Sequence, residues 1–232
     1  MTYREYAPTA ELRPDFRCGW TNQVADRADP FLVLPDGCID LVWSDGRLRV
    51  AGPDRRAAVT PAGRLVVGLR FQPGAAADWL GVPASDIVDA RPGLDAFWGD
   101  QAQALADWAG EARDALGILD RLQAGLQMRQ PRIRRRAADA AAVFDLIGRG
   151  ADPGWHPRSL RRRCHDWFGY GPKTLDAILR LQRFITLCRT GGEARLAMAA
   201  IAAGYADQPH LNRETRRLCG LTPRGLLAQL EG

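Results

Sequence analysis

An alternation of apolar and polar residues marks the first third of the chain and predicts β-strands. Residues 38–43 and 64–71 alternate in this way, and residues 31–34 form a short apolar run before a turn at 35–37. On one face of the run 38–43 lie Ile39, Leu41 and Trp43. Because such strands bury one face and expose the other, residues 1–72 are predicted to form a small antiparallel β barrel or sandwich.

Two glycine-containing positions refine this β-region. The pair Asp45-Gly46 stands between two alternating runs, and this dipeptide favours a tight hairpin turn. Gly68 interrupts one face of the run 64–71, which indicates a bulge or a close backbone approach. The sequence therefore predicts a hairpin at residue 45 and an irregular contact at residue 68.

Helical spacing replaces alternation after residue 72. Residues 75–80 and 83–87 suit short helices, and residues 99–127 carry apolar side chains at helical spacing, which predicts one long helix or a helix pair. Gln130-Pro131 interrupts this pattern. We therefore expect an α+β, multidomain chain with three parts. These are a β-rich regulatory domain (1–98), a helical linker (99–130) and an all-α domain (131–232).

Charge separates the two halves of the chain. Residues 1–128 carry 13 basic and 18 acidic side chains, a net charge of −5, whereas residues 129–232 carry 19 basic and 9 acidic side chains, a net charge of +10. A solvated basic face would give the same count. A basic module behind an acidic one is nevertheless typical of a nucleic-acid-binding domain joined to a second domain.

Residues 157–168 are predicted to form an amphipathic helix. Pro157 suits the first helical position and Gly169 suits the residue after the last. The inner face carries Leu160, Cys164, Trp167 and Phe168, and the outer face carries Arg158, Arg161, Arg162 and His165. An arginine-rich outer face suits the major groove of DNA, although an ordinary surface helix shares this pattern.

A second helical unit is predicted over residues 196–218. Small residues line the helix 196–203, Gly204 ends it, and Asp207 suits the N-cap of the next helix. Small residues let two helices cross closely, as a helix-turn-helix requires. The second helix of this unit has Leu211, Thr215 and Leu218 inside, and Gln208, Pro209, His210, Asn212, Arg213 and Arg216 outside or flanking.

A single helix over residues 172–189 is predicted to join the two units. Its length at 1.5 Å per residue is about 27 Å. Neighbouring major-groove segments on one face of DNA lie about 34 Å apart. A helix of this length, with the helices at its ends, can hold two recognition helices one turn of DNA apart.

The motifs in this region resemble the AraC/XylS family of transcriptional regulators. Residues 204–213 (Gly-Tyr-Ala-Asp-Gln-Pro-His-Leu-Asn-Arg) and 219–223 (Cys-Gly-Leu-Thr-Pro) resemble the second helix-turn-helix of that family. Residues 158–163 and 168–173 are similar to the first recognition helix and to the start of the linker helix. The resemblance covers about residues 150–228. It implies a bipartite domain and a sequence-specific DNA-binding regulator with two recognition helices in successive major grooves.

The resemblance and the helical faces together give the expected DNA contacts. These are Arg158, Ser159, Arg161, Arg162, Lys173, Gln208, Pro209, His210, Asn212, Arg213 and Arg216. We expect Lys173, at a helix N-terminus, and Arg216 to contact phosphate, and Arg158, Arg162 and Arg213 to approach bases.

The first unit departs from the family pattern. Too few residues separate Gly150 from His156 for a positioning helix, so either residues 137–147 fill that role across a long turn, or the unit is truncated. Cys164 and Thr215 stand where aromatic residues are usual, and Pro209 cannot donate a hydrogen bond to a base. These departures keep open a protein-interaction module that has lost specific DNA binding.

The first half resembles an uncharacterised domain that often precedes such DNA-binding domains. Residues 34–43, 51–53 and 67–74 carry the resemblance, which covers about residues 3–99. It implies a sensor or dimerisation role for this half. Candidate ligand-binding residues are Trp20, Cys38, Trp43 and Arg70.

The cysteine and histidine positions bear on other possible functional sites. The five cysteines are scattered and the three histidines all lie in the C-terminal half, so no disulfide framework, metal site or cofactor is expected. An enzyme is not expected either. One alternative is a DNA alkyl acceptor or thiol sensor using Cys38 or Cys18, although the Pro-Cys-His-Arg type of motif is absent.

The expected partners follow from this interpretation. They are double-stranded DNA and RNA polymerase, with a small-molecule effector and a homodimer through residues 105–126 as further candidates. No signal peptide or apolar run of about 20 residues occurs, so we expect no membrane contact and a cytoplasmic protein.

Overall fold

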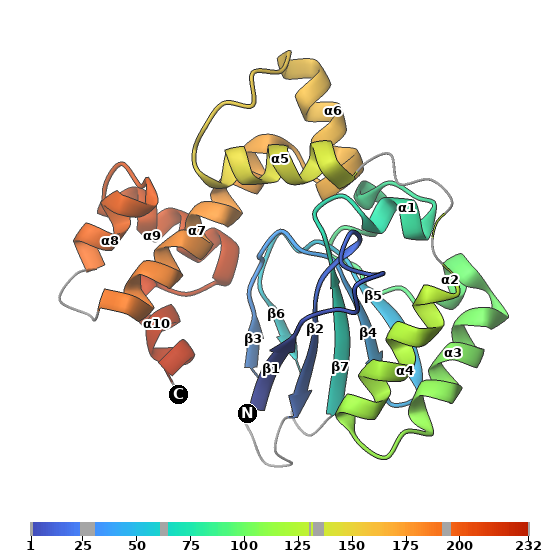
Figure 1. The fold of residues 1–232 in the computed structure, drawn as a ribbon. Helices are drawn as coiled ribbons and strands as arrows, with labels where there is room; N and C mark the ends of the chain where they lie inside the picture. Colours follow the sequence, from blue (N-terminus) through green and yellow to red (C-terminus); the bar gives the residue numbers. More distant parts are fainter. Residues whose placement is uncertain are drawn as a thin grey trace.

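The computed structural model describes residues 2–23, 31–60, 65–129, 131, 137–191 and 196–231. Figure 1 shows a sheet-containing first half and a helical second half, which confirms the expected α+β class. Arg64 and Gln130, which the sequence placed at a strand start and at a domain boundary, lie outside the described residues.

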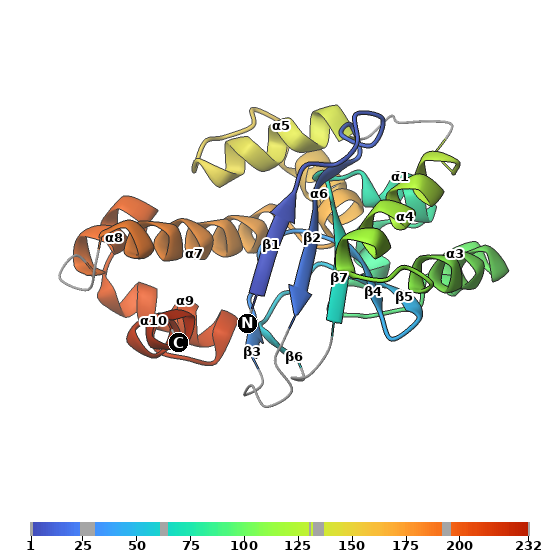
Figure 2. The ribbon, with the colours of Figure 1, turned by 60° about the horizontal axis from the view of Figure 1, so that its bottom comes forward.

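The first half is built on an antiparallel sheet with strand order β1-β2-β7-β4-β5, beside a two-stranded sheet β3-β6. The strands are β1 (Thr2–Tyr6), β2 (Phe16–Gln23), β3 (Phe31–Val33), β4 (Asp40–Ser44), β5 (Arg47–Ala51), β6 (Ala58–Thr60) and β7 (Leu65–Phe71). Alternation works as expected, because Leu41 and Trp43 of β4 point into the core while Asp40, on the other face, pairs with Arg70 of β7. Figure 2 shows the two sheets from below.

Local sequence signals explain two details of the sheet. Asp45 and Gly46 adopt φ values of 52° and 72° between the paired residues Ser44 and Arg47, which is the two-residue hairpin that the sequence predicts. At Gly68 the close approach comes from a side chain rather than from backbone. A Cβ built there would lie 2.3 Å from the Trp20 indole, so the glycine makes room for that ring across the strand pair.

Helices cover one face of the large sheet. They are α1 (Ala76–Leu80), the 3₁₀ helix η1 (Ala84–Ile87), α2 (Asp95–Trp98), α3 (Asp100–Gly110) and α4 (Ala115–Gln127). Residues 99–127 therefore form a helix pair. Leu119, Leu122 and Leu126 of α4 are buried in the same core as the strands. The apolar side considered for a dimer thus packs on the chain's own sheet, and Trp108 and Leu116 stay partly exposed.

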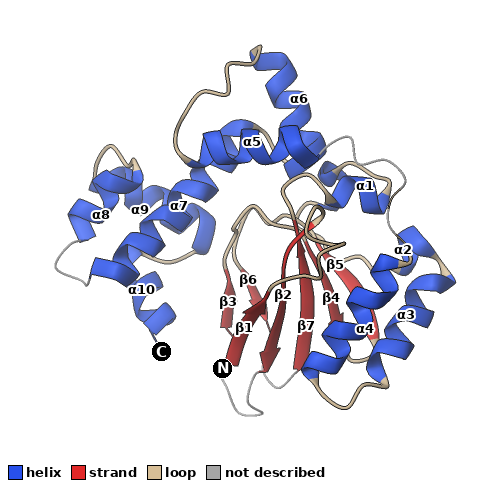
Figure 3. Ribbon diagram, in the orientation of Figure 1, coloured by secondary structure: helices blue, strands red, loops and turns tan. Residues whose placement is uncertain are grey.

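The second half is all-helical (Figure 3). Its helices are α5 (Ala137–Gly148), α6 (Pro157–Phe168), α7 (Pro172–Gly191), α8 (Leu196–Ala203), α9 (Gln208–Cys219) and α10 (Pro223–Glu231). They enclose a second hydrophobic core that includes Phe168, Phe184 and Leu218. No helix in the described part of the chain is both long and apolar enough to span a membrane.

The two halves touch directly. Leu32, Leu34, Ala57 and Val88 of the first half pack against the second core. The Gln182 side chain of α7 donates a hydrogen bond of 2.8 Å to the carbonyl of Pro35. The recognition units therefore rest on the sheet domain instead of standing apart from it.

Candidate nucleic-acid interface

Helix α6 presents the arginine-rich face that its sequence predicts. Pro157 occupies the first turn, and Gly169 ends the helix with a φ of 83°. The predicted inner residues are all buried, and Arg158, Arg161 and Arg162 are exposed. Ser159 is half-buried on the same helix.

Helix α5 precedes the first recognition helix in the second half. It packs on α7, and its Phe144 ring meets the Phe168 ring of α6 edge-on, with centroids 5.6 Å apart. The loop 149–156 joins the two helices (Figure 1). Residues 149–156 contain no helix, so a positioning role for residues 137–147 across this long turn stays a prediction, as does a truncated first unit.

Arg163 contacts three parts of the first unit. Its guanidinium lies 4.6 Å from the ring centroid of Trp155 and 5.5 Å from that of Trp167. Its Nη1 also lies 3.7 Å from a carboxylate oxygen of Asp139 in α5. This arginine links the loop 149–156, α6 and α5. Stacking on two indole rings suits its planar guanidinium cation. Nothing in the sequence pattern indicates that Trp155 or Asp139 contacts Arg163.

The second unit has the turn that its sequence predicts. Gly204 ends α8 with a φ of 96°, and Tyr205 is buried against Phe184 of α7. The Asp207 side chain accepts a hydrogen bond of 2.6 Å from the backbone N–H of His210, so it caps α9. Leu211, Thr215 and Leu218 are buried, as predicted.

The predicted contact residues of α9 divide into two groups. Gln208, Pro209, Arg213 and Arg216 are exposed, and Asn212 is half-buried. His210 is engaged within the protein, because its ring packs on Tyr205 and its Nδ1 lies 3.4 Å from the backbone nitrogen of Ala206. His210 therefore stabilises the turn, and the exposed side chains are the ones free to face a ligand.

A charged network fixes α9 to α7. Arg180 of α7 approaches Asp176 at 2.7 Å and Glu214 of α9 at 3.5 Å, and its guanidinium stands over the Tyr205 ring. Glu214 also forms an ion pair with Arg217, whose Nη2 lies 3.8 Å from its carboxylate. Sequence spacing could not reveal this network, because residues 180 and 214 come from different helices.

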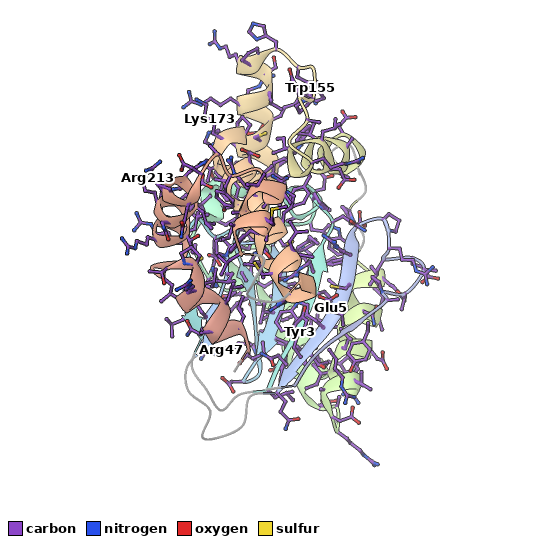
Figure 4. The ribbon with its side chains drawn as sticks, turned by 90° about the vertical axis from the view of Figure 1, so that its left-hand side faces the viewer. Tyr3, Glu5, Arg47, Trp155, Lys173 and Arg213 are labelled. Carbon is purple, nitrogen blue, oxygen red and sulfur yellow. The ribbon has the colours of Figure 1, made fainter. Side chains whose placement is uncertain are left out.

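Helix α7 sets the distance between the units. Its 20 residues correspond to about 30 Å at 1.5 Å per residue. Lys173 is exposed in its first turn. Figure 4 shows Lys173 and Arg213 on the same side of the molecule, with Trp155 above them on the loop before α6. The linking helix and the second unit therefore each present a basic side chain on this side.

The candidate ligand residues of the first half do not all meet. Trp20 and Arg70 gather around Asp40, whose carboxylate lies 3.4 Å from the Trp20 indole nitrogen and 3.1 Å from Arg70 Nε. Arg70 also reaches Asp36 at 3.1 Å, next to Cys38. Trp43 lies on the opposite face of the sheet, where its indole N–H donates to the carbonyl of Ala106.

The two cysteines of this region are poor nucleophiles. Burial raises the pKa of Cys18 to about 11, with the Glu5 carboxylate adding to the effect. Burial and the neighbouring Asp36 raise the pKa of Cys38 well above its usual range. Because the thiolate is the reactive form, these surroundings disfavour alkyl transfer or thiol sensing here.

Alkylation of the native protein should therefore be slow. At pH 8 the thiolate fraction of Cys18 is expected to be about 100-fold below that of a thiol of pKa 9, since each pKa unit is a factor of ten. Iodoacetamide labelling followed by peptide mass mapping measures the rate, with denatured protein as the control. Labelling of Cys18 or Cys38 at the denatured rate would contradict the expectation.

Comparison with known proteins gives two separate family matches along the chain. Residues 4–92 match the family model of a domain of unknown function (DUF6597). Residues 153–229 match the family model of a helix-turn-helix domain. No curated protein matches the chain. The chain thus carries an AraC-type, DNA-binding helix-turn-helix domain of the kind found in transcription regulators, behind an N-terminal domain of unknown function.

Proposed function

We propose that this DNA-binding regulator reads sequence with both recognition helices, α6 and α9, in successive major grooves. The observation that carries the proposal is the pair of exposed arginine-bearing helices joined by an α7 of about 30 Å. That length approaches the roughly 34 Å between neighbouring major-groove segments on one face of DNA.

The residue roles follow from exposure and side-chain chemistry. Arg158, Arg162 and Arg213 are the proposed base readers, because a guanidinium can donate two hydrogen bonds to guanine. Arg161, Gln208 and Asn212 approach bases or phosphates beside them, flanked by Ser159 and Pro209. Lys173 and Arg216 are the proposed phosphate contacts, and His210 supports the turn.

Selection from a random duplex library tests this proposal. The full-length protein should enrich a two-part motif, with Arg213→Ala blurring one part and Arg158→Ala blurring the other about one helical turn away. Each lost contact should cost about 1–3 kcal/mol of base discrimination. Arg121→Ala removes the same charge from α4, far from both helices, and should leave the motif unchanged.

Three outcomes are informative. If only Arg213→Ala changes the motif, α6 is a backbone clamp. If no motif is enriched and binding disappears at moderate salt, the basic half is only an electrostatic surface and the proposal is wrong. If Arg121→Ala blurs the motif as strongly, the effect is one of net charge.

The proposal extends to control by residues 1–98, with 99–130 linking them to the DNA-binding domain 131–232. The packing of Leu32, Leu34, Ala57 and Val88 on the second core supports a coupling of the two halves. A small-molecule effector near Trp20, Cys38 and Arg70, a second copy of the chain and RNA polymerase are the proposed partners.

A further inference from the structure

One short segment of the first half, residues 52–57, lies between β5 and β6 and is hydrogen-bonded to residues 89–91. The Pro53 carbonyl accepts a hydrogen bond of 3.1 Å from the backbone N–H of Asp89. Asp89 in turn accepts from the backbone N–H and the Nε of Arg55, both at 2.7 Å. Arg91 pairs with Asp54 through both of its terminal nitrogens. Four contacts therefore fasten the segment to residues 89–91.

The beginning of this segment touches the end of the first recognition helix. A Cβ built on Gly169, which ends α6, would lie 2.7 Å from Pro53 Cγ and 2.6 Å from Val88 Cγ2. It would also lie 3.0 Å from the carbonyl oxygen of Ala84 in η1. The end of α6 is thus seated against the 52–57 segment and the residues that brace it.

The end of the same segment touches the end of the second recognition helix. The backbone N–H of Ala57 donates a hydrogen bond of 2.7 Å to the carbonyl of Leu218 in α9. The last four carbonyls of a helix have no partner within it, so this contact caps the helix from another domain. Ala57 also packs against the second hydrophobic core.

These contacts place the C-terminal ends of both recognition helices on this one segment. Pro53 and Ala57 are four residues apart, so the two contact points lie within about 14 Å of each other, the reach of an extended chain of that length. Helix α7 joins the units along one path, and the 52–57 segment joins them along a second. The second connection restricts the separation and the relative tilt of the two units beyond what their packing on α7 already does.

We infer that the 52–57 segment sets the spacing between half-sites that the protein accepts in DNA. The sheet domain would then affect the DNA-sequence specificity directly, because it would help to fix the distance between α6 and α9. This inference rests on the proposed reading of two grooves, and it assigns the positioning role to Ala57 and to the Arg55–Asp89 pair.

The test measures affinity against half-site spacing with the full-length chain. The duplex is the selected site, together with versions that have one base pair added or removed between its two parts. One base pair displaces a half-site by about 3.4 Å along the DNA. The wild-type protein should bind the altered duplexes much more weakly than the selected site.

Ala57→Pro removes the N–H that caps α9, and Ala57→Ser keeps it as the matched control. The proline variant should lose about 3- to 10-fold of the wild-type preference for native spacing, the ratio that corresponds to one hydrogen bond. The serine variant should keep the full preference. An unchanged preference in a proline variant that folds and binds would overturn the inference.

A second pair of variants guards against misfolding at residue 57. Asp89 has a φ of 56°, which glycine and asparagine tolerate. Asp89→Gly removes the carboxylate that holds Arg55, and Asp89→Asn keeps an acceptor there. The glycine variant should relax the spacing preference more than the asparagine variant, and equal preference in both would count against the inference.

If the wild type shows a two-part motif but no spacing preference, the inference alone fails. If it shows no two-part motif, the proposed function fails with it.

Discussion

Phe184→Ala is expected to lower the free energy of unfolding by about 3–5 kcal/mol and to abolish specific DNA binding at working temperature. Phe184 is fully buried in the middle of α7. Its ring packs edge-on against the Tyr205 ring, with the two ring centroids 6.1 Å apart. Truncation would leave a cavity between α7 and the turn that presents α9. The lost packing would destabilise α7, the helix that joins both recognition units.

Chemical denaturation followed by circular dichroism measures this loss. Leu187→Ala on the same helix is the matched control, because Leu187 is 37% exposed and should cost less than about 1.5 kcal/mol. Equal losses in the two variants would mean that the second core is not organised around Phe184. Coincident transitions by circular dichroism and by tryptophan fluorescence would indicate that the two cores unfold together.

Gly169→Ala should be far more damaging than Gly220→Ala, although both glycines end a recognition helix in the left-handed region. Their φ values are 83° and 74°, so each alanine pays about 1–2 kcal/mol of backbone strain. Only at position 169 does the new Cβ also overlap the first half, against Pro53 and Val88. At Gly220 nothing lies within 4 Å of that position.

The comparison separates strain from contact between the two halves. Thermal unfolding of both variants gives the difference, and overpacking adds about 1–3 kcal/mol at position 169 alone. Similar melting temperatures would show that α6 does not rest on the sheet domain in solution. The 52–57 segment would then lose one of its two anchors.

Local signals predicted most of the elements correctly. Asp45-Gly46, Gly169 and Asp207 each act within a few residues of themselves, through turn geometry or capping, and all three behave as expected. The alternation of apolar and polar residues in β4 also indicates which face of the sheet each side chain occupies. It places Trp43 with Leu41 on the core face, so grouping Trp43 with Trp20 and Arg70 conflicted with the pattern itself.

Contacts between distant parts of the chain could not be predicted in this way. Arg163 was given no role by the helical pattern, yet its guanidinium lies over the indoles of Trp155 in the loop and Trp167 in the helix. His210 sat on the outer arc of α9, and only the fold shows its ring on Tyr205. The pairing of Ala57 with Leu218 joins residues whose sequence separation conceals any relation.

Lys173 gives the protein an unusual chemical property. It is the only lysine of the sequence, and it is exposed in the first turn of α7, on the side shared with Arg213. Arginine resists acylation, so an amine-reactive reagent or an acetyl-transferring enzyme has one side chain to modify. A fluorophore on this side chain would report DNA docking from a known position once labelling of the α-amino terminus is blocked, and acetylation of Lys173 would remove one charge without touching any proposed base-reading residue.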